Sequence, residues 1–415
     1  MTPRQNRHVL IAIALSVSVA FFFGGSTLNA QSGESASSEY IAADADTAIP
    51  VYDTAWQMFG LASADEADQY FATLQEYGFT GTWAGLIHHA PATYAHGFDG
   101  GGTVAEIDSS GNVVFTPEYI EHVNLILDEA QEYGRKVGIV AAWQNLYLPG
   151  GTIHSGDSES DAVRGTIDED NAYTYGQQIV EAFGDHPAVS MWVFGGDGSS
   201  NNTEENKVVW RNMAAGVRDA GSTLDITYHT PTSFFDQLNY AGEPWLDFIS
   251  PETGHTQSAE ETELELLAAA EAYQLPVWQG EARYFNIIGS WIPDEFVSPD
   301  IEEMKADAIA ARNAGVVGYV YGDAGRWNWC RGWGDATPCE PDRIADSFGP
   351  AEEAVIDVFR AEVTEEQVEI EEPLEEILPE VVAEDGVTIE YDVVIDLEEA
   401  APALGPLVTE SNLTD

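Results

Sequence analysis

The sequence predicts an α/β protein built as a (β/α)8 barrel, also called a TIM barrel. Over residues 48–360, short apolar or β-branched runs alternate with amphipathic helical patterns. This alternation is typical of parallel strands that are joined by helices, and the segment is long enough for a barrel of about 250 residues. A doubly wound open sheet is the alternative architecture. It is disfavoured because no glycine-rich dinucleotide-binding loop follows the first apolar run.

Eight apolar runs are the predicted strands. In chain order they cover residues 48–56, 79–86, 136–143, 188–195, 224–229, 246–251, 276–281 and 316–321. The helical patterns between them include DEADQYFATLQEYG, PEYIEHVNLILDEAQEYG and IEEMKADAIAARNAG. Each of these three patterns closes on a glycine, which often ends a helix because it adopts a left-handed conformation without strain.

Residues 1–30 have the layout of a secretory signal peptide. Two arginines precede an apolar run over residues 9–23, and small and polar residues lead to an expected cleavage site after Ala30. An uncleaved membrane anchor is the alternative, but the run is short for a membrane span. We therefore expect a secreted or periplasmic protein without membrane contact after cleavage. Residues 31–47 form a polar, acidic linker.

The other end of the chain is an acidic tail. Residues 361–415 contain no Lys or Arg, and their Glu/Pro-rich beginning is typical of a solvated tether. The later VTIEYDVVIDLE alternates like a strand and could belong to a small β unit. The whole chain carries 15 basic and 72 acidic residues, a net charge of −57. This charge excludes nucleic acid as a partner and suits a protein in salty surroundings.

The chain has two cysteines, Cys330 and Cys339, which lie close together in the sequence. In an oxidising compartment we expect them to form a disulfide after the eighth strand. No Cys/His spacing fits structural zinc, and no metal or cofactor is expected. The sequence makes no prediction of the oligomeric state.

The carboxyl ends of barrel strands usually carry the chemistry. Acids, histidines and aromatic residues gather there in this sequence, and besides the predicted sites named below they include Trp83, Gln144 and Glu252. Aromatic rings stack on the apolar faces of sugars and acids accept hydrogen bonds from hydroxyls, so this composition indicates a carbohydrate substrate. The predicted substrate-binding residues are Asp53, Trp56, Trp143, His229, His255, Tyr321 and Trp327.

Two carboxylates stand out by position. Asp197 follows the fourth strand in VFGGDG, and Glu281 ends the seventh strand in PVWQGE. Strands four and seven face each other across a barrel, so the pair can bracket one glycosidic bond, and glycoside cleavage needs two carboxyl groups. Gly195 and Gly196 would leave room for a sugar beside Asp197. The structural alternative is that Asp197 caps the following helix.

The order of several motifs resembles that of the apiosidase-like glycoside hydrolases, which are secreted bacterial barrel enzymes. The motifs are DTAWQMF, FGDHPAVSMWVFGGD, ITYHTP, EPWLDFISPETGH, VWQGEARY and GYVYGDAGRW, and they span roughly residues 48–330. The resemblance implies a retaining hydrolase with Asp197 as acid/base and Glu281 as nucleophile. It also implies that Asp53, Trp56, His229 and His255 line the pocket.

The chain departs from this family in two places. GEARYF has Phe285 where the family often has an acid, and the loop over residues 88–114 differs as well. The expected substrate is a plant or algal polysaccharide, but the departures leave its sugar open. Two other functions stay open from the residues. One is a catalytically silent carbohydrate-binding barrel. The other is a metal-dependent hydrolase that uses His88, His89, His229 and His255.

Overall fold

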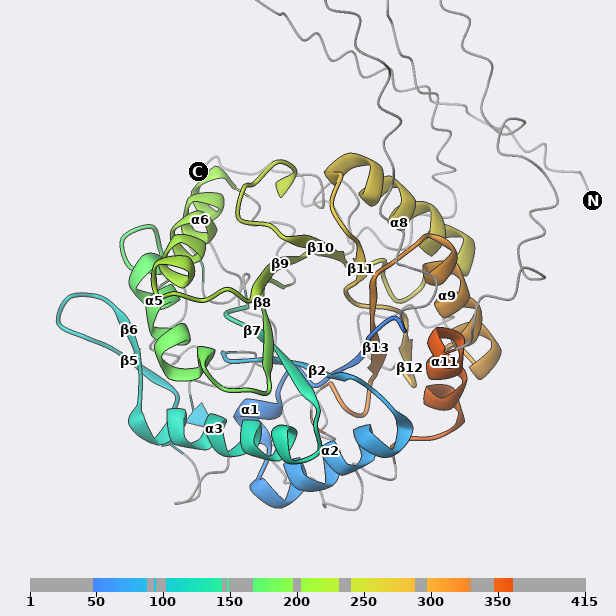
Figure 1. Cartoon of the computed structure of the whole chain (residues 1–415), viewed down its shortest axis with the longest axis horizontal. Helices are drawn as coiled ribbons and strands as arrows, with labels where there is room; N and C mark the ends of the chain where they lie inside the picture. Colours follow the sequence, from blue (N-terminus) through green and yellow to red (C-terminus); the bar gives the residue numbers. More distant parts are fainter. Residues whose placement is uncertain are drawn as a thin grey trace, which may run out of the picture. The chain divides into compact units, whose positions relative to one another are not determined.

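The chain folds into a parallel β-barrel surrounded by helices (Figure 1). The computed structural model describes residues 48–87, 93–94, 102–143, 148, 167–196, 203–230, 240–287, 297–327, 329 and 347–360. The predicted signal peptide, linker, acidic tail and disulfide lie outside these residues. Their predictions are not addressed by the structure.

All eight predicted strands are present. They are β1 (Val51–Thr54), β2 (Gly81–Gly85), β7 (Lys136–Val140), β8 (Val189–Gly195), β9 (Asp225–Thr230), β10 (Phe248–Pro251), β11 (Trp278–Gln279) and β13 (Gly318–Asp323). Each pairs in parallel with its neighbours, in the order β10-β9-β8-β7-β2-β1-β13-β11. The predicted (β/α)8 barrel is thereby confirmed.

Two isolated parallel bridges join the ends of this sheet. Ile249 pairs with Val277, and Glu252 pairs with Glu281. They connect β10 to β11, so the barrel is nearly closed. The second bridge places two acids side by side although 28 other residues lie between them in the chain.

The helices surround the barrel (Figure 1). They are α1 (Met58–Leu61), α2 (Ala64–Tyr77), α3 (Pro117–Glu132), α5 (Ala172–Ile179) with the π-helical turn η1 (Val180–Gly184), α6 (Glu204–Asp219), α8 (Ala259–Tyr273), α9 (Ile301–Asn313) and α11 (Pro350–Arg360). Among the described residues, none of them is both long and apolar enough to span a membrane.

Local sequence signals explain where several helices begin and end. Capping boxes start α2 at Ser63, α8 at Ser258 and α9 at Asp300, and each uses a glutamate three residues later. The three glycines predicted to follow helices, Gly78, Gly134 and Gly315, all have positive φ. The three capping boxes also place Glu66, Glu261 and Glu303 in the first turn of a helix, where the helix dipole favours negative charge.

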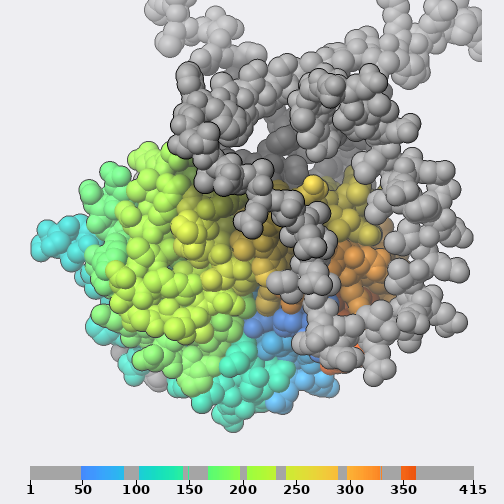
Figure 2. Space-filling model, turned by 45° about the horizontal axis from the view of Figure 1, so that its top comes forward, coloured from blue at the N-terminus to red at the C-terminus, as the bar shows by residue number. Residues whose placement is uncertain are grey.

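Shorter strands lie outside the barrel ring. β12 (Tyr284–Phe285) pairs with β13, and β3 (Thr93–Tyr94) pairs with β4 (Gly102–Thr103). β5 (Ala105–Ile107) and β6 (Val113–Phe115) form an antiparallel hairpin. This hairpin projects beyond the neighbouring helices (Figures 1 and 2).

Large aromatic side chains fill the barrel. Trp278 from β11 contacts Trp83 from β2 at a ring-centroid distance of 6.1 Å and Tyr52 from β1 at 5.4 Å. Gly318 of β13 makes this possible, because a Cβ atom there would lie 2.2 Å from the Trp278 ring. The interior is thus a packed core, and ligand contacts are left to the ends of the strands.

Candidate active site

The ends of β9, β10 and β11 and the start of β12 bring a buried polar group together around Glu281. Glu281 follows β11, His229 belongs to β9, and Glu252 and His255 follow β10. Tyr284 begins β12 on the same side. The side chains of Glu281 and His229 are 6% and 0% exposed, so their charges are shielded from water. Electrostatic interactions are stronger in such a place than at the surface.

Three side chains surround the Glu281 carboxylate, two of them as hydrogen-bond donors. His229 Nε2 lies 2.9 Å from Glu281 Oε2, His255 Nε2 lies 3.8 Å from Oε1, and the Tyr284 hydroxyl donates a hydrogen bond to the carboxylate. Burial opposes ionisation, but the hydrogen bond and charge of His229, with His255 and Tyr284, lower the pKa of Glu281 below its usual range. Glu281 is therefore an ionised carboxylate at neutral pH.

Two further contacts hold Tyr284 and His255 in place beside Glu281. Trp56 Nε1, just after β1, donates to the Tyr284 hydroxyl at 2.7 Å, so a chain of hydrogen bonds runs from Trp56 through Tyr284 to Glu281. The His255 ring packs 4.4 Å from the Tyr284 ring. Burial lowers the pKa of His255, although the charge of Glu281 opposes this. His255 is thus mainly neutral above pH 6.5.

Aromatic rings surround His229. Trp56 stacks on its imidazole at 5.6 Å between ring centroids, and Trp143 lies 5.9 Å away. Trp56 and Trp143 also contact each other at 5.3 Å. The structure therefore brings four of the predicted sugar-binding residues, Trp56, Trp143, His229 and His255, to Glu281. Both tryptophans are about 2% exposed, and their contact with a sugar stays a prediction.

Asp53 and Tyr321 point to a different part of the molecule. Asp53 is fully buried and accepts hydrogen bonds from Arg326 Nε at 3.0 Å and from the Tyr70 hydroxyl at 2.8 Å. Burial raises the pKa of Asp53 to about 6 in spite of Arg326. Tyr321 is buried beside the same guanidinium, which lies 5.5 Å from its ring centroid. Successive strand residues alternate in direction, so these side chains face the helices, which does not favour their predicted sugar contact.

Arg326 joins this second group to the last helix. Its Nη2 donates to Glu352 Oε1 of α11 at 2.8 Å, and its guanidinium lies over the Phe348 ring at 4.0 Å. Trp327, the remaining predicted sugar contact, is half-buried, and its carbonyl accepts from Gln57 N at 3.2 Å. The structure shows the Asp53–Arg326–Glu352 group as a connection between barrel and helices.

Asp197 lies outside the described residues, as do His88, His89, Cys330 and Cys339. The distance between the carboxyl groups of Asp197 and Glu281 stays a prediction. The alternative that Asp197 caps α6 is wrong, because α6 begins at Glu204 and the Thr203 hydroxyl accepts from Asn206 N at 3.2 Å. Gly196, the residue before Asp197, donates its N–H to the His229 carbonyl at 3.1 Å. The end of β8 therefore lies beside His229 at Gly196.

Gly195 and Gly196 were expected to leave room for a sugar. Their φ values are +98° and +102°, which few residues other than glycine adopt. A Cβ atom on Gly196 would lie 2.6 Å from the Trp143 ring, and one on Gly195 would lie 2.1 Å from the His229 carbonyl oxygen. Trp143 and the β9 backbone, both from this chain, occupy that space. The glycines serve the internal packing of the site.

Glu252 and Tyr284 belong to the site, although the sequence pattern predicts no role for either residue. Glu252 was seen at a strand end, and only its bridge to Glu281 shows that the two acids are neighbours. Tyr284 lies in the GEARYF stretch, three residues after Glu281, where β12 turns it back toward the carboxylate. Its pairing with β13 could not be read from two residues of sequence.

The polar group around Glu281 contains possible metal ligands. Among the described residues, His229, Glu252 and Glu281 each offer one atom that can bind a metal, and these atoms lie within 4.8 Å of one another.

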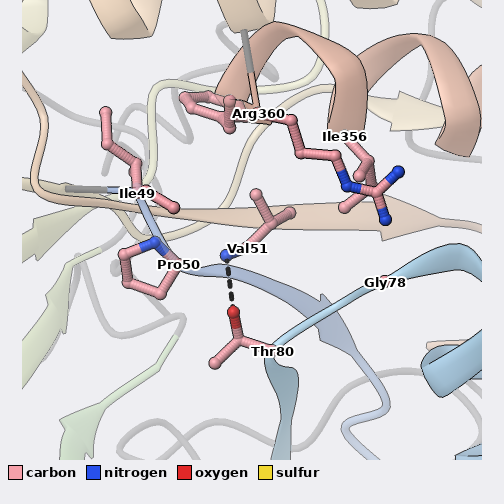
Figure 3. A pocket seen from close by; sticks show the side chains of 9 residues that line it. Ile49, Pro50, Val51, Gly78, Thr80, Ile356 and Arg360 are labelled. Carbon is pink, nitrogen blue, oxygen red and sulfur yellow. Dashed lines mark hydrogen bonds between the residues drawn. The ribbon is translucent and has the colours of Figure 1, made fainter. Parts of the chain in front are cut away.

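A separate pocket of about 360 Å³ lies near the start of β1 and the end of α11. It is lined by Pro50, Gly78, Thr80 and Arg360 among others (Figure 3). It has no carboxylate and carries no catalytic chemistry.

The structure is similar to a family 5 glycoside hydrolase from Bacteroides vulgatus, with a TM-score of 0.51 and 19% identity, covering 69% of this chain and 62% of that one. A second glycoside hydrolase has a TM-score of 0.54 and 18% identity, covering 70% and 65%. The chain spans a little under two thirds of the length of these two proteins. At such identities the likeness shows the barrel fold.

The nearly closed barrel and the buried carboxylate group at its strand ends define the chain as a TIM-barrel protein with a polar site at one rim. The sequence model described as "Apiosidase-like, catalytic domain" matches residues 36–340. The chain belongs to this apiosidase-like family, and the resemblance of its motifs is confirmed. No curated protein matches the sequence closely enough to count as a relative.

Proposed function

We propose that the protein is a retaining glycoside hydrolase in which Glu281 is the nucleophile and Asp197 the acid/base. The observation that carries this proposal is the buried, ionised Glu281 at the carboxyl end of β11, with His229 and Tyr284 as hydrogen-bond donors and His255 beside it. A retaining enzyme needs such a carboxylate at the anomeric carbon. A silent carbohydrate-binding barrel would have no use for a buried charge, which is costly to maintain.

The reaction has two displacements. In the first, Glu281 Oε attacks the anomeric carbon while Asp197 gives its proton to the leaving oxygen, so the glycosidic bond breaks and a glycosyl–Glu281 ester forms. In the second, Asp197 takes a proton from water, whose oxygen attacks the anomeric carbon and releases Glu281. His229 and Tyr284 orient the carboxylate by their hydrogen bonds to it.

The substrate is a plant or algal polysaccharide, and the enzyme meets it outside the cytoplasm. Membership of the apiosidase-like family and the aromatic group around His229 support a saccharide substrate. The signal-peptide layout of residues 1–30 supports export. A panel of plant and algal polysaccharides, with released sugars analysed by chromatography, tests the substrate class.

Variants of the two acids test the mechanism. Glu281→Gln should abolish hydrolysis, whereas Asp197→Asn should keep activity on substrates with good leaving groups and gain from added azide. Glu265→Gln, which removes a half-buried acid on α8, is the matched control and should stay active. NMR of the first-formed product should show the anomeric configuration of the substrate. Wild-type rates in both acid variants, or an inverted product, would contradict the proposal.

A further inference from the structure

Three side chains that can bind a metal ion lie together where β9, β10 and β11 end. β9 and β10 pair through Ser250 and His229, and Glu252 bridges directly to Glu281, so the backbone fixes all three positions. One donor atom from each of His229, Glu252 and Glu281 lies within 4.8 Å of the others. The three residues are 0%, 4% and 5% exposed, so the group is shielded from solvent.

The charge of this group favours a cation. Glu252 and Glu281 place two carboxylates side by side in a buried position, where like charges repel strongly. His255 Nε2 lies 3.6 Å from Glu252 Oε1 and 3.8 Å from Glu281 Oε1. A divalent ion would offset both carboxylates at once.

The donor set selects the kind of ion. One imidazole nitrogen and two carboxylate oxygens suit Zn²⁺ and similar transition metals, whereas Ca²⁺ and Mg²⁺ prefer sites made of oxygen alone. Ligands at about 2.1 Å from a tetrahedral ion lie about 3.4 Å apart. The three donors would therefore need to approach one another by small side-chain rotations.

We propose that His229, Glu252 and Glu281 bind a divalent transition-metal ion, Zn²⁺ being the best match, and that this ion inhibits the enzyme. Inhibition follows because the metal takes the oxygen of Glu281 that attacks the sugar and the His229 nitrogen that orients it. This inhibitory part rests on the proposed function, but the binding of the ion does not.

Binding is tested on the full chain without substrate, by titrating Co²⁺ and recording its visible absorption, and by calorimetry with Zn²⁺. Saturable binding of one ion is expected, and Glu252→Gln should weaken it by at least about tenfold. Glu265→Gln removes a carboxylate outside the group and should bind as the wild type does. Should Glu252→Gln not fold, Glu252→Asp keeps the charge but shortens the side chain, and it should also weaken binding.

Two results would overturn the metal site: no saturable binding up to about 1 mM metal, or equal binding by folded Glu252 variants. Inhibition is then measured as glycan hydrolysis in chelator and in rising Zn²⁺. Full activity in chelator and loss with Zn²⁺ are expected for the wild type and for Glu265→Gln, and stimulation by Zn²⁺ would contradict inhibition. A chain that binds Co²⁺ through Glu252 but hydrolyses no glycan supports the metal site and contradicts the proposed function.

Discussion

At the scale of single residues, partners decide what each acid in this barrel can do. Glu281 and Asp53 are both buried at strand ends. His229, His255 and Tyr284 lower the pKa of Glu281 and leave it ionised. Burial raises the pKa of Asp53 to about 6, although Arg326 binds it. The sequence placed both acids at the same rim, and only their partners separate a carboxylate with a lowered pKa from one with a raised pKa.

His229 should determine the pH below which the enzyme loses activity. His229→Phe keeps a ring between Trp56 and Trp143 but removes the donor at 2.9 Å from Glu281. Without that donor the pKa of Glu281 rises. Because the proposed nucleophile works only when ionised, the acid limb of kcat/KM should move to higher pH. The value of kcat/KM should also fall by tenfold or more for a lost bond of about 1.5–3 kcal/mol to a charged group.

The measurement is a pH–rate profile of the variant and the wild type, with circular dichroism to show that both are folded. Tyr284→Phe is a useful companion, since it removes a second donor and should move the limb in the same direction. An acid limb that stays at the wild-type pH in His229→Phe would show that His229 does not control Glu281.

At the scale of elements, strand ends and turns carry the geometry of the site. The end of β8 turns through Gly195 and Gly196, both with positive φ, and the second of them packs against Trp143. β12 is only two residues long, yet its pairing with β13 returns Tyr284 to Glu281. Thr203 caps α6, which separates the start of that helix from Asp197.

Gly196→Ala should destabilise the fold and reduce activity. The variant has an unfavourable φ of +102° and a Cβ atom 2.6 Å from the Trp143 ring, so both backbone strain and overlap contribute. A cost of about 2–4 kcal/mol in the free energy of unfolding is expected from these two effects. Urea denaturation monitored by tryptophan fluorescence measures it.

Gly111→Ala is the matched control. Gly111 lies in the turn between β5 and β6 with φ of +86°, but a Cβ atom there would meet no atom within 4 Å. It should show the cost of backbone strain alone, about 1 kcal/mol. Equal losses at the two positions would mean that Trp143 yields to the added methyl group without cost.

At the scale of the whole molecule, α11 completes the barrel although it lies beyond the family match at residues 36–340. Glu352 binds Arg326 at 2.8 Å, and the Phe359 ring packs 4.8 Å from Tyr319 of β13. Arg360 Nη2 also donates to the Tyr77 carbonyl at 2.7 Å. These contacts place α11 within the folded unit up to Arg360.

Truncation tests this boundary and the predicted tether. A chain that ends after Arg360 loses the acidic tail but keeps every contact of α11, so its Tm and activity should match those of the full chain. A chain that ends after Gly349 also loses α11, leaves Arg326 without Glu352 and exposes core, so its Tm should fall by 10 °C or more for a loss of about 4 kcal/mol. Differential scanning calorimetry distinguishes the two. A similar fall in both would show that the tail packs on the barrel.

The sequence by itself determined the barrel. Eight runs of strand residues, separated by helices with readable caps and C-terminal glycines, are local features, and local propensity with hydrophobic pattern specifies them. It also placed Trp56, Trp143, His229, His255 and Glu281 at one rim, because the carboxyl ends of parallel strands must meet at one end of a barrel.

Only the tertiary structure decided which of these rim residues touch. Asp53 and Tyr321 turn toward Arg326 because alternate residues of a strand face opposite sides, and register decides which side is which. Glu252 became a neighbour of Glu281 through a single bridge between strands that are distant in the sequence. Such pairings depend on closure of the whole barrel, and a pattern of residues read along one chain does not contain the distances across it.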